Sequence, residues 1–159
     1  MKFGQLLIGV LLGAMLSFGL TNYLAKPKLS TASTSTSAKW TWPDSLDAVK
    51  AAPDNHKVVY EDSTVRVLQV LLNGHKAEPV HTHKWKSVMW IAKPAVPCTI
   101  YQYKVSENGK FVASDSVTIP HMDTDIGQPI GAEGPTGIKN AGSDNGIAYR
   151  IEFKKDFKP

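Results

Sequence analysis

Two histidines separated by one residue, His81 and His83, are the side chains of this chain best suited to chemistry. They follow an apolar run at residues 64–72 and a glycine at Gly74. Side chains two positions apart in a β-strand point to the same face, so one strand would present both imidazoles together. Neutral imidazole binds zinc, copper, iron and nickel. The spacing therefore predicts a divalent metal ion shared by His81 and His83. The alternative is a pair of hydrogen-bonded histidines in a site without metal.

Two imidazoles leave such a site incomplete, because bound zinc normally has three or four protein ligands. His121 is the first candidate for a third ligand, since it opens a segment of alternating polar residues at 121–125. A solvated loop explains that segment as well. His75 has the same parity as His81 but falls at an expected turn, and Glu78 has the opposite parity.

Several aromatic and apolar side chains are candidates for the wall of a ligand cavity, although core packing explains them equally well. Tyr101 and Tyr103 share a face and carry hydroxyl groups, so they could contact a ligand or cover one side of a sheet. The expected ligand-binding residues are Trp85, Met89, Trp90, Tyr101, Tyr103 and Thr136.

The elements that must position these residues are mostly β-strands. Residues 44–52 predict one short helix, with Asp44 as its N-cap and Pro53 at its end. Apolar or alternating runs predict strands at 64–72, 87–92, 99–105, 111–119 and 147–153. Asn108-Gly109 predicts a tight hairpin, and the glycine- and proline-rich residues 127–137 predict a loop. Many short strands without a long helix indicate an all-β sandwich or barrel.

The N-terminal part of the chain has a different composition. An apolar run at residues 3–20 predicts a signal anchor or signal peptide within residues 1–25. Residues 26–39 are rich in Ser and Thr and predict a flexible linker to a domain at 40–159. We expect a domain held at the inner membrane through residues 3–20, in the periplasm or outside the cell; secretion after cleavage is the alternative. Gly9 and Gly13 could pack two anchors together, and a homodimer is one expected form.

The charge of the chain argues against binding to nucleic acid. Four of its 18 basic residues are lysines in the first 39 positions, so the domain carries 14 basic and 14 acidic residues and is formally neutral. Nucleic-acid binding would need a basic face on the domain itself. A single cysteine, Cys98, excludes an intrachain disulfide and is expected to be a small buried hydrophobe.

The segments 51–68, 78–88 and 133–142, with the strand at 147–153, together resemble a small bacterial cupin-domain protein. The resemblance implies a double-stranded β-helix, or jelly-roll barrel, that binds a divalent metal in its interior. It places His81 and His83 at the first two ligand positions. The glutamate ligand would fall near Ser87 or Val88, and the last histidine would fall at Thr136.

Two functions are therefore expected from the sequence. The first is a cupin-like domain that binds a small molecule, or a weakly held divalent metal, in its barrel without catalysis. The second is a metal-dependent oxygenase, isomerase or lyase with His81 and His83 as ligands. The first is favoured, because the chain lacks half of the usual ligand set and no acid or base is evident.

Overall fold

A computed structural model describes residues 40–155 of the chain. The expected signal segment at 1–25 and linker at 26–39 lie outside the described residues. Within residues 40–155, no helix has both the length and the apolar character needed to cross a membrane.

The short helix expected at 44–52 is divided into two pieces. A 3₁₀ turn, η1 (Asp44–Leu46), is followed by one turn of α-helix, α1 (Ala48–Ala51). The predicted N-cap was wrong: the side chain of Asp47, not Asp44, accepts a hydrogen bond from the amide of Val49 at 3.1 Å. Asp47 has an extended backbone (φ −53°, ψ 136°), which interrupts the helix and lets its carboxylate cap α1.

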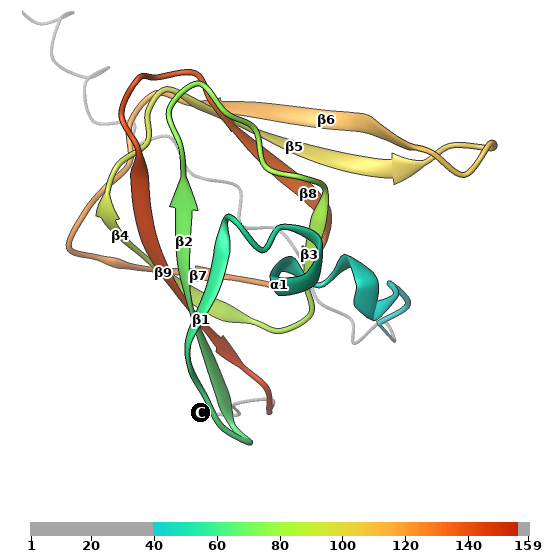
Figure 1. Ribbon diagram of the computed structural model, residues 1–159, viewed down its shortest axis with the longest axis horizontal. Helices are drawn as coiled ribbons and strands as arrows, with labels where there is room; N and C mark the ends of the chain where they lie inside the picture. The colour runs from blue at the N-terminus through green and yellow to red at the C-terminus, as the bar shows by residue number, and fades with distance from the viewer. Residues whose placement is uncertain (1–39, 156–159) are drawn as a thin grey trace, which may run out of the picture. The chain divides into compact units, whose positions relative to one another are not determined.

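Within the described residues 40–155, nine strands form two antiparallel sheets (Figure 1). The larger sheet has the order β1-β2-β9-β4-β7 and the smaller one the order β3-β8-β5-β6. In chain order the strands are β1 (His56–Glu61), β2 (Val65–Leu72), β3 (His81–His83), β4 (Ser87–Lys93), β5 (Cys98–Val105), β6 (Phe111–Ile119), β7 (Gly127–Ile130), β8 (Glu133–Asn140) and β9 (Gly146–Phe153).

The expected strands match β2, β4, β5, β6 and β9 to within one residue at each end. The Asn-Gly turn is also confirmed, because β5 and β6 form a hairpin in which Gly109 has a φ of 77°. In Figure 1 this hairpin extends away from the other strands.

The loop predicted at 127–137 was wrong, since this segment contains β7 and the first half of β8. Pro129 is tolerated because β7 is an edge strand, where a missing N–H breaks no ladder. The glycines of β8 lie within the strand instead of in a turn, and Gly134 allows close packing. A Cβ on Gly134 would lie 3.3 Å from the indole nitrogen of Trp42, whereas one on Gly137 would make only an ordinary contact, 3.4 Å from the carbonyl oxygen of Glu78.

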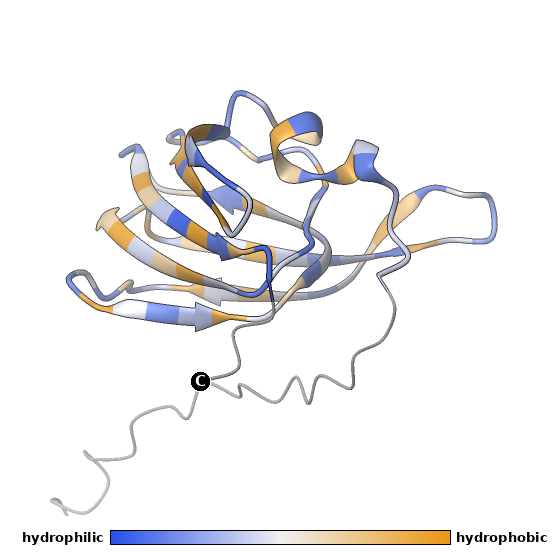
Figure 2. Ribbon diagram, turned by 90° about the horizontal axis from the view of Figure 1, so that it is seen from below, coloured by the Kyte–Doolittle hydropathy of each residue, from blue (hydrophilic) through white to orange (hydrophobic). Residues whose placement is uncertain are grey.

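Strands β2 and β9 divide the interior into two chemically different ends. Along their paired inner faces, Leu72 lies opposite Gly146, Val70 opposite Ala148, Leu68 opposite Arg150 and Arg66 opposite Glu152. The side chains on these inner faces are buried. The apolar end continues through Ala95 and Cys98, which is fully buried as expected. Figure 2 shows the resulting mixture of polar and apolar positions along the strands. The polar end carries the candidate site.

Candidate metal centre

Three buried histidines from two strands form a cluster inside the barrel. His56 begins β1, and His81 and His83 are the ends of β3. Their ring centroids are 4.6 Å apart for His56 and His81, 5.2 Å for His56 and His83, and 5.0 Å for His81 and His83. Each residue is at most 3% exposed. One nitrogen from each ring lies within 4.8 Å of the other two, so the three rings converge on a common point.

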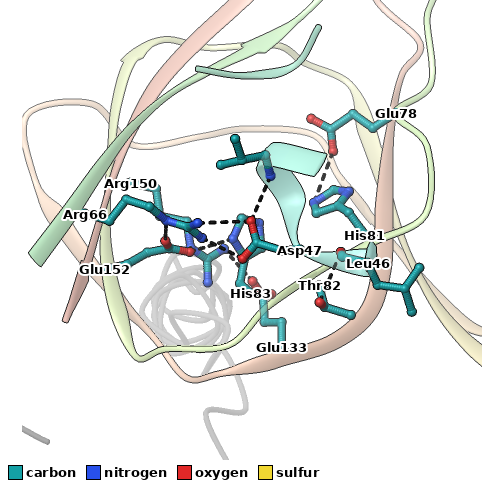
Figure 3. Close-up of polar contacts among 11 residues, drawn as sticks. Leu46, Asp47, Arg66, Glu78, His81, Thr82, His83, Glu133, Arg150 and Glu152 are labelled. Atoms are coloured by element: carbon teal, nitrogen blue, oxygen red, sulfur yellow. Dashed lines mark hydrogen bonds and ion pairs between the residues drawn. The ribbon is translucent and has the colours of Figure 1, made fainter. Parts of the chain in front are cut away.

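The short helix holds the two strands of the cluster together. Ala52 is the C-cap of α1, and its carbonyl accepts a hydrogen bond from the backbone amide of His56 at 3.0 Å. Asp47, at the start of the helix, forms a parallel bridge with Thr82. The Thr82 hydroxyl also donates to the carbonyl of Leu46 at 3.1 Å (Figure 3). The segment before β1 is therefore fixed directly against β3, and this places His56 next to both His81 and His83.

Hydrogen bonds set the orientation of two of the rings. Nδ1 of His81 lies 2.9 Å from the carbonyl oxygen of Pro79, and Nδ1 of His83 lies 2.8 Å from Oε1 of Glu152. A carbonyl and a carboxylate only accept, so each Nδ1 must carry the proton and donate it. The Nε2 lone pairs of both rings are then free for a ligand, as in metal-binding histidines held by outer carboxylates and carbonyls.

A chain of buried ion pairs holds Glu152 in place (Figure 3). Its Oε2 accepts from Nε of Arg66 at 2.6 Å. Arg66 in turn donates through both terminal nitrogens to the two oxygens of Asp47, at 3.0 and 2.9 Å. The carboxylate that orients His83 is thus connected to the cap of α1, which precedes His56. The positions of His56 and His83 therefore depend on one continuous network of ion pairs.

All three imidazoles are held in the neutral form. Burial lowers the pKa of His56 to about 2, with further lowering by the neighbouring histidines. Burial also lowers the pKa of His81, and it lowers that of His83 well below the ordinary value. The positive charge of Arg150 contributes to each of these shifts. Neutral imidazole is the form that binds metal ions, so the cluster is ready to act as a ligand set without losing protons.

The cluster fits a transition metal ion with little rearrangement. In a tetrahedral site with metal–nitrogen bonds of about 2.1 Å, the nitrogens lie about 3.4 Å apart. Closing separations of up to 4.8 Å to that value requires each ring to shift by under about 1 Å. In addition, Nδ1 of His56 is buried without a hydrogen-bond partner among the described residues. A bound ion would give this nitrogen a partner, or it would hold the ring of His56 in one orientation through the other nitrogen.

Other buried polar groups beside the cluster also lack hydrogen bonds. Burial raises the pKa of the Glu78 carboxyl to about 8. Neither of its oxygens has a well-formed hydrogen bond within residues 40–155, although the backbone of Ile138 is near enough to lower that pKa in part. Nε and Nη2 of Arg150 and the hydroxyl of Ser87 are unsatisfied as well. Unpaired buried polar atoms are uncommon in native proteins, so their concentration here indicates a place for a ligand, an ion or water.

The structure brings only two of the three expected metal ligands together. His81 and His83 are in the cluster, whereas the side chain of His121 is 80% exposed and pairs with Asp123 at 3.3 Å. His121 lies between β6 and β7, outside any strand, so no sheet carries it into the barrel. The polar segment at 121–125 is mostly exposed, as the solvated-loop alternative expects.

Three of the expected ligand-binding residues lie on β4 or in the turn before it. Their environments differ. Trp85 packs under the guanidinium of Arg66, whose central carbon is 4.8 Å from the ring centroid. Met89 packs against the apolar core cluster. Trp90 is 40% exposed, and its position on β4 gives it the opposite parity to the buried Ser87 and Ile91. The structure therefore places Trp90 on the outer face of its sheet.

The expected residues of the smaller sheet lie next to each other. Tyr101 and Tyr103 are half-buried, and their rings are 6.3 Å apart. Thr136 is the direct partner of His81 between β8 and β3. Its hydroxyl donates to the carbonyl of Tyr101 at 3.0 Å and is already satisfied within the sheet.

Two functional candidates, His56 and Glu78, were missed or set aside from the sequence. Nothing in the spacing of His56 connects it with His81, because the contact is made only by folding. Glu78 was set aside on strand parity. The parity rule does not apply to it, since β3 begins at His81 and Glu78 precedes that strand. Both residues are distinguished by buried side-chain atoms that lack a hydrogen-bond partner among the described residues.

Comparison with solved structures identifies the fold. A cupin domain from Bordetella pertussis Tohama I is similar over 63% of this chain and 92% of its own, with 15% identity and a TM-score of 0.50. An RmlC-like cupin family protein from Methanocaldococcus jannaschii is similar over 62% of this chain and 77% of its own, with 11% identity and a TM-score of 0.41. No protein-family model and no curated protein matches the sequence. The described domain has the cupin fold, with two antiparallel sheets around a partly polar interior.

Proposed function

We propose that this cupin domain binds one divalent transition metal ion through His56, His81 and His83. The observation that carries the proposal is the convergence of three buried, neutral imidazoles whose ligand nitrogens lie within 4.8 Å of one another. The Nδ1 contacts of His81 and His83 support it, because they leave Nε2 of both rings free. All-imidazole sites suit zinc, copper, iron and nickel better than magnesium or calcium.

We further propose that a small polar molecule binds beside the ion. Three protein ligands leave at least one coordination position open, and a bound ion would there polarise an oxygen of the small molecule as a Lewis acid. The unsatisfied nitrogens of Arg150 and the hydroxyl of Ser87 are possible donors to such an oxygen. Ser87 lies directly opposite Glu152, and Arg150 is two residues along the same face of β9, so these donors share the inner face of one strand pair. The proposed role is binding, and no reaction is assigned.

We also propose that the domain is exported and tethered to the inner membrane. The apolar run at residues 3–20 and the Ser- and Thr-rich residues before position 39 support this. A reporter fused after Pro159 should be active only outside the cytoplasm. A reporter active only inside the cytoplasm would contradict export, and an N-terminus beginning near Leu20 would indicate a secreted protein.

Metal analysis of the purified full chain tests the proposed ion. The natural chain should retain close to one equivalent of a transition metal ion after loading and dialysis. The double variant His81→Ala, His83→Ala should lose it, while His121→Ala should retain it and serve as the matched control. Absence of metal from the natural chain, or equal retention by the double variant, would contradict the proposal.

A further inference from the structure

Residues 40–52 form a segment that packs against the polar end of the barrel, and we call it the N-terminal strap. It joins edge strands of the two sheets, since α1 contacts both β1 and β3 (Figure 1). Ala48 and Ala52 of the strap are at most 1% exposed, and Val49 packs against a core cluster of the larger sheet. Because the strap follows the expected linker, it connects the domain with the N-terminal part of the chain.

The strap has little stability of its own. Its α-helix is a single turn, Ala48–Ala51, and isolated helices shorter than about 12 residues are marginal in water. The order of the strap therefore depends on its contacts with the barrel. Segments of this kind belong to the low-stability parts of a protein, which open without global unfolding.

The contacts that hold the strap also hold the strands that carry the three histidines. At the end of the strap, the carbonyl of Ala52 accepts the amide of His56 at 3.0 Å. At its middle, the carbonyl of Leu46 accepts the hydroxyl of Thr82 at 3.1 Å, and Thr82 lies between the two histidines of β3. Opening of the strap breaks the connection between β1 and β3, so the three imidazoles lose their common support.

Asp47 adds a third link, which is made by charge. Its two carboxylate oxygens accept from Arg66 at 3.0 and 2.9 Å. Arg66 also donates to Glu152, which accepts from Nδ1 of His83. Removal of one partner from a buried ion pair is strongly destabilising, so the closed strap favours the arrangement that orients His83. Asp47 is thus a positioning residue that acts on the cluster without touching it.

We infer that a metal ion at the three histidines locks the strap closed, and that opening of the strap weakens metal binding. The inference rests on the proposed metal site and adds its regulation. An ion that binds the closed form better shifts the strap toward that form, and the coupling is reciprocal. Occupancy of the site is thereby transmitted to the segment that leads into the N-terminal part of the chain.

Amide hydrogen exchange in the full chain, with and without Zn²⁺, tests the coupling. Without metal, the strap amides of Lys50, Ala51 and Ala52 should exchange faster than the paired amides of β2 and β9. At a free Zn²⁺ concentration of about 100 times Kd, an ion that binds only the closed form slows them about 100-fold, and we expect at least about tenfold. The amides of Ser106 and Gly109, in the β5–β6 turn, are the internal control and should not change.

A matched pair of variants tests whether the contact with β3 holds the strap. Thr82→Val removes the hydroxyl bonded to Leu46 and leaves every imidazole in place, so the strap amides of the metal-free chain should exchange about threefold to tenfold faster. Thr99→Val removes a hydroxyl that contacts Thr118 in the β5–β6 hairpin and should leave strap exchange unchanged. Thr82→Ser keeps the hydroxyl and should behave like the natural chain.

The outcomes separate the inference from the proposed function. A natural chain that binds no Zn²⁺ contradicts the metal site and the coupling together. Bound Zn²⁺ that leaves strap exchange unchanged contradicts the coupling alone. So does a metal-free strap that exchanges no faster than β2 and β9, because it would not open separately. Equal strap exchange in Thr82→Val and Thr99→Val would overturn the assigned contact with β3.

Discussion

The two ends of the barrel interior are built by the same strand pair but are stabilised by different forces. At one end, Leu72, Ala95 and Cys98 pack as an ordinary apolar core. At the other, Arg66 and Glu152 occupy equivalent inward positions and bury charge. Burial of apolar groups stabilises the fold on its own, whereas buried charges stabilise it only when they are paired. The difference indicates that the apolar end contributes only to the stability of the fold, whereas the paired charges of the polar end both stabilise the fold and orient the site.

The strongest expected effect is on the polar end. Replacing Glu152 with Ala leaves Arg66 without its partner on β9 and removes the acceptor of His83. We expect the free energy of unfolding of the metal-free chain to fall by about 3–5 kcal/mol, as for broken buried ion pairs. Denaturation by urea measures it. A loss below about 1 kcal/mol, the range of exposed pairs, would show that the network is not desolvated.

A cavity at the apolar end should have a comparable effect on stability but none on metal binding. Leu72→Ala should lower the free energy of unfolding by about 2–5 kcal/mol. Its Co²⁺ affinity, measured where the variant is fully folded, should equal that of the natural chain. Reduced affinity would show that the two ends are coupled and would break the comparison.

The pH dependence of the metal-free chain should reflect the polar end. The pKa of His56 is lowered to about 2 in the folded state, so below its ordinary value of 6.5 the unfolded chain binds more protons and stability falls with decreasing pH. His81 and His83 act in the same direction. The pKa of Glu78 is raised from 4.5 to about 8, so the folded chain holds a proton that is released on unfolding, and stability falls as the pH rises through that window.

These opposite slopes predict maximum stability of the metal-free chain near pH 6.5, because up to three histidines outweigh one carboxyl below that value. Urea denaturation at several pH values between 4 and 9 measures the curve. Glu78→Gln should remove the decline between pH 6.5 and 8 and keep the acid side. A decline that persists in Glu78→Gln would assign it to another group.

The smallest effects come from a matched pair of hydroxyl groups. Ser87 has an unsatisfied hydroxyl, whereas Thr136 donates to the carbonyl of Tyr101. In the metal-free chain, Ser87→Ala should change the free energy of unfolding by less than about 0.5 kcal/mol, while Thr136→Val should lower it by about 1 kcal/mol. Thermal unfolding of both variants checks the order. Equal losses would mean that the Ser87 hydroxyl has a partner in solution.

The strand pattern could be predicted from the sequence because it depends on local alternation and turn residues. Strands β2 and β9 and the Asn108-Gly109 hairpin are examples. The segment containing β7 and β8 could not be predicted, because its glycines and prolines serve packing and an edge position rather than a turn. Local sequence patterns predict strands and turns, but they do not predict which segments pack closely against one another.

Only the part of the candidate site that lies on a single strand could be predicted from the sequence. His81 and His83 share β3, so their spacing revealed them. His56 joins them through the contacts of α1 with β3, and Glu78 joins through a backbone hydrogen bond to β8. Both contacts form between distant parts of the sequence. The alternation of side chains within one strand cannot detect such contacts. Relying on it made His121 the first candidate for the third ligand.

The most direct test of the account is the position of the ion in a crystal of the metal-loaded chain, located by its anomalous scattering. The account predicts one ion at the polar end of the barrel, with a nitrogen of His56, His81 and His83 each within about 2.0–2.2 Å. An ion bound instead at His121 and Asp123, or a loaded chain whose three histidines hold none, would contradict it.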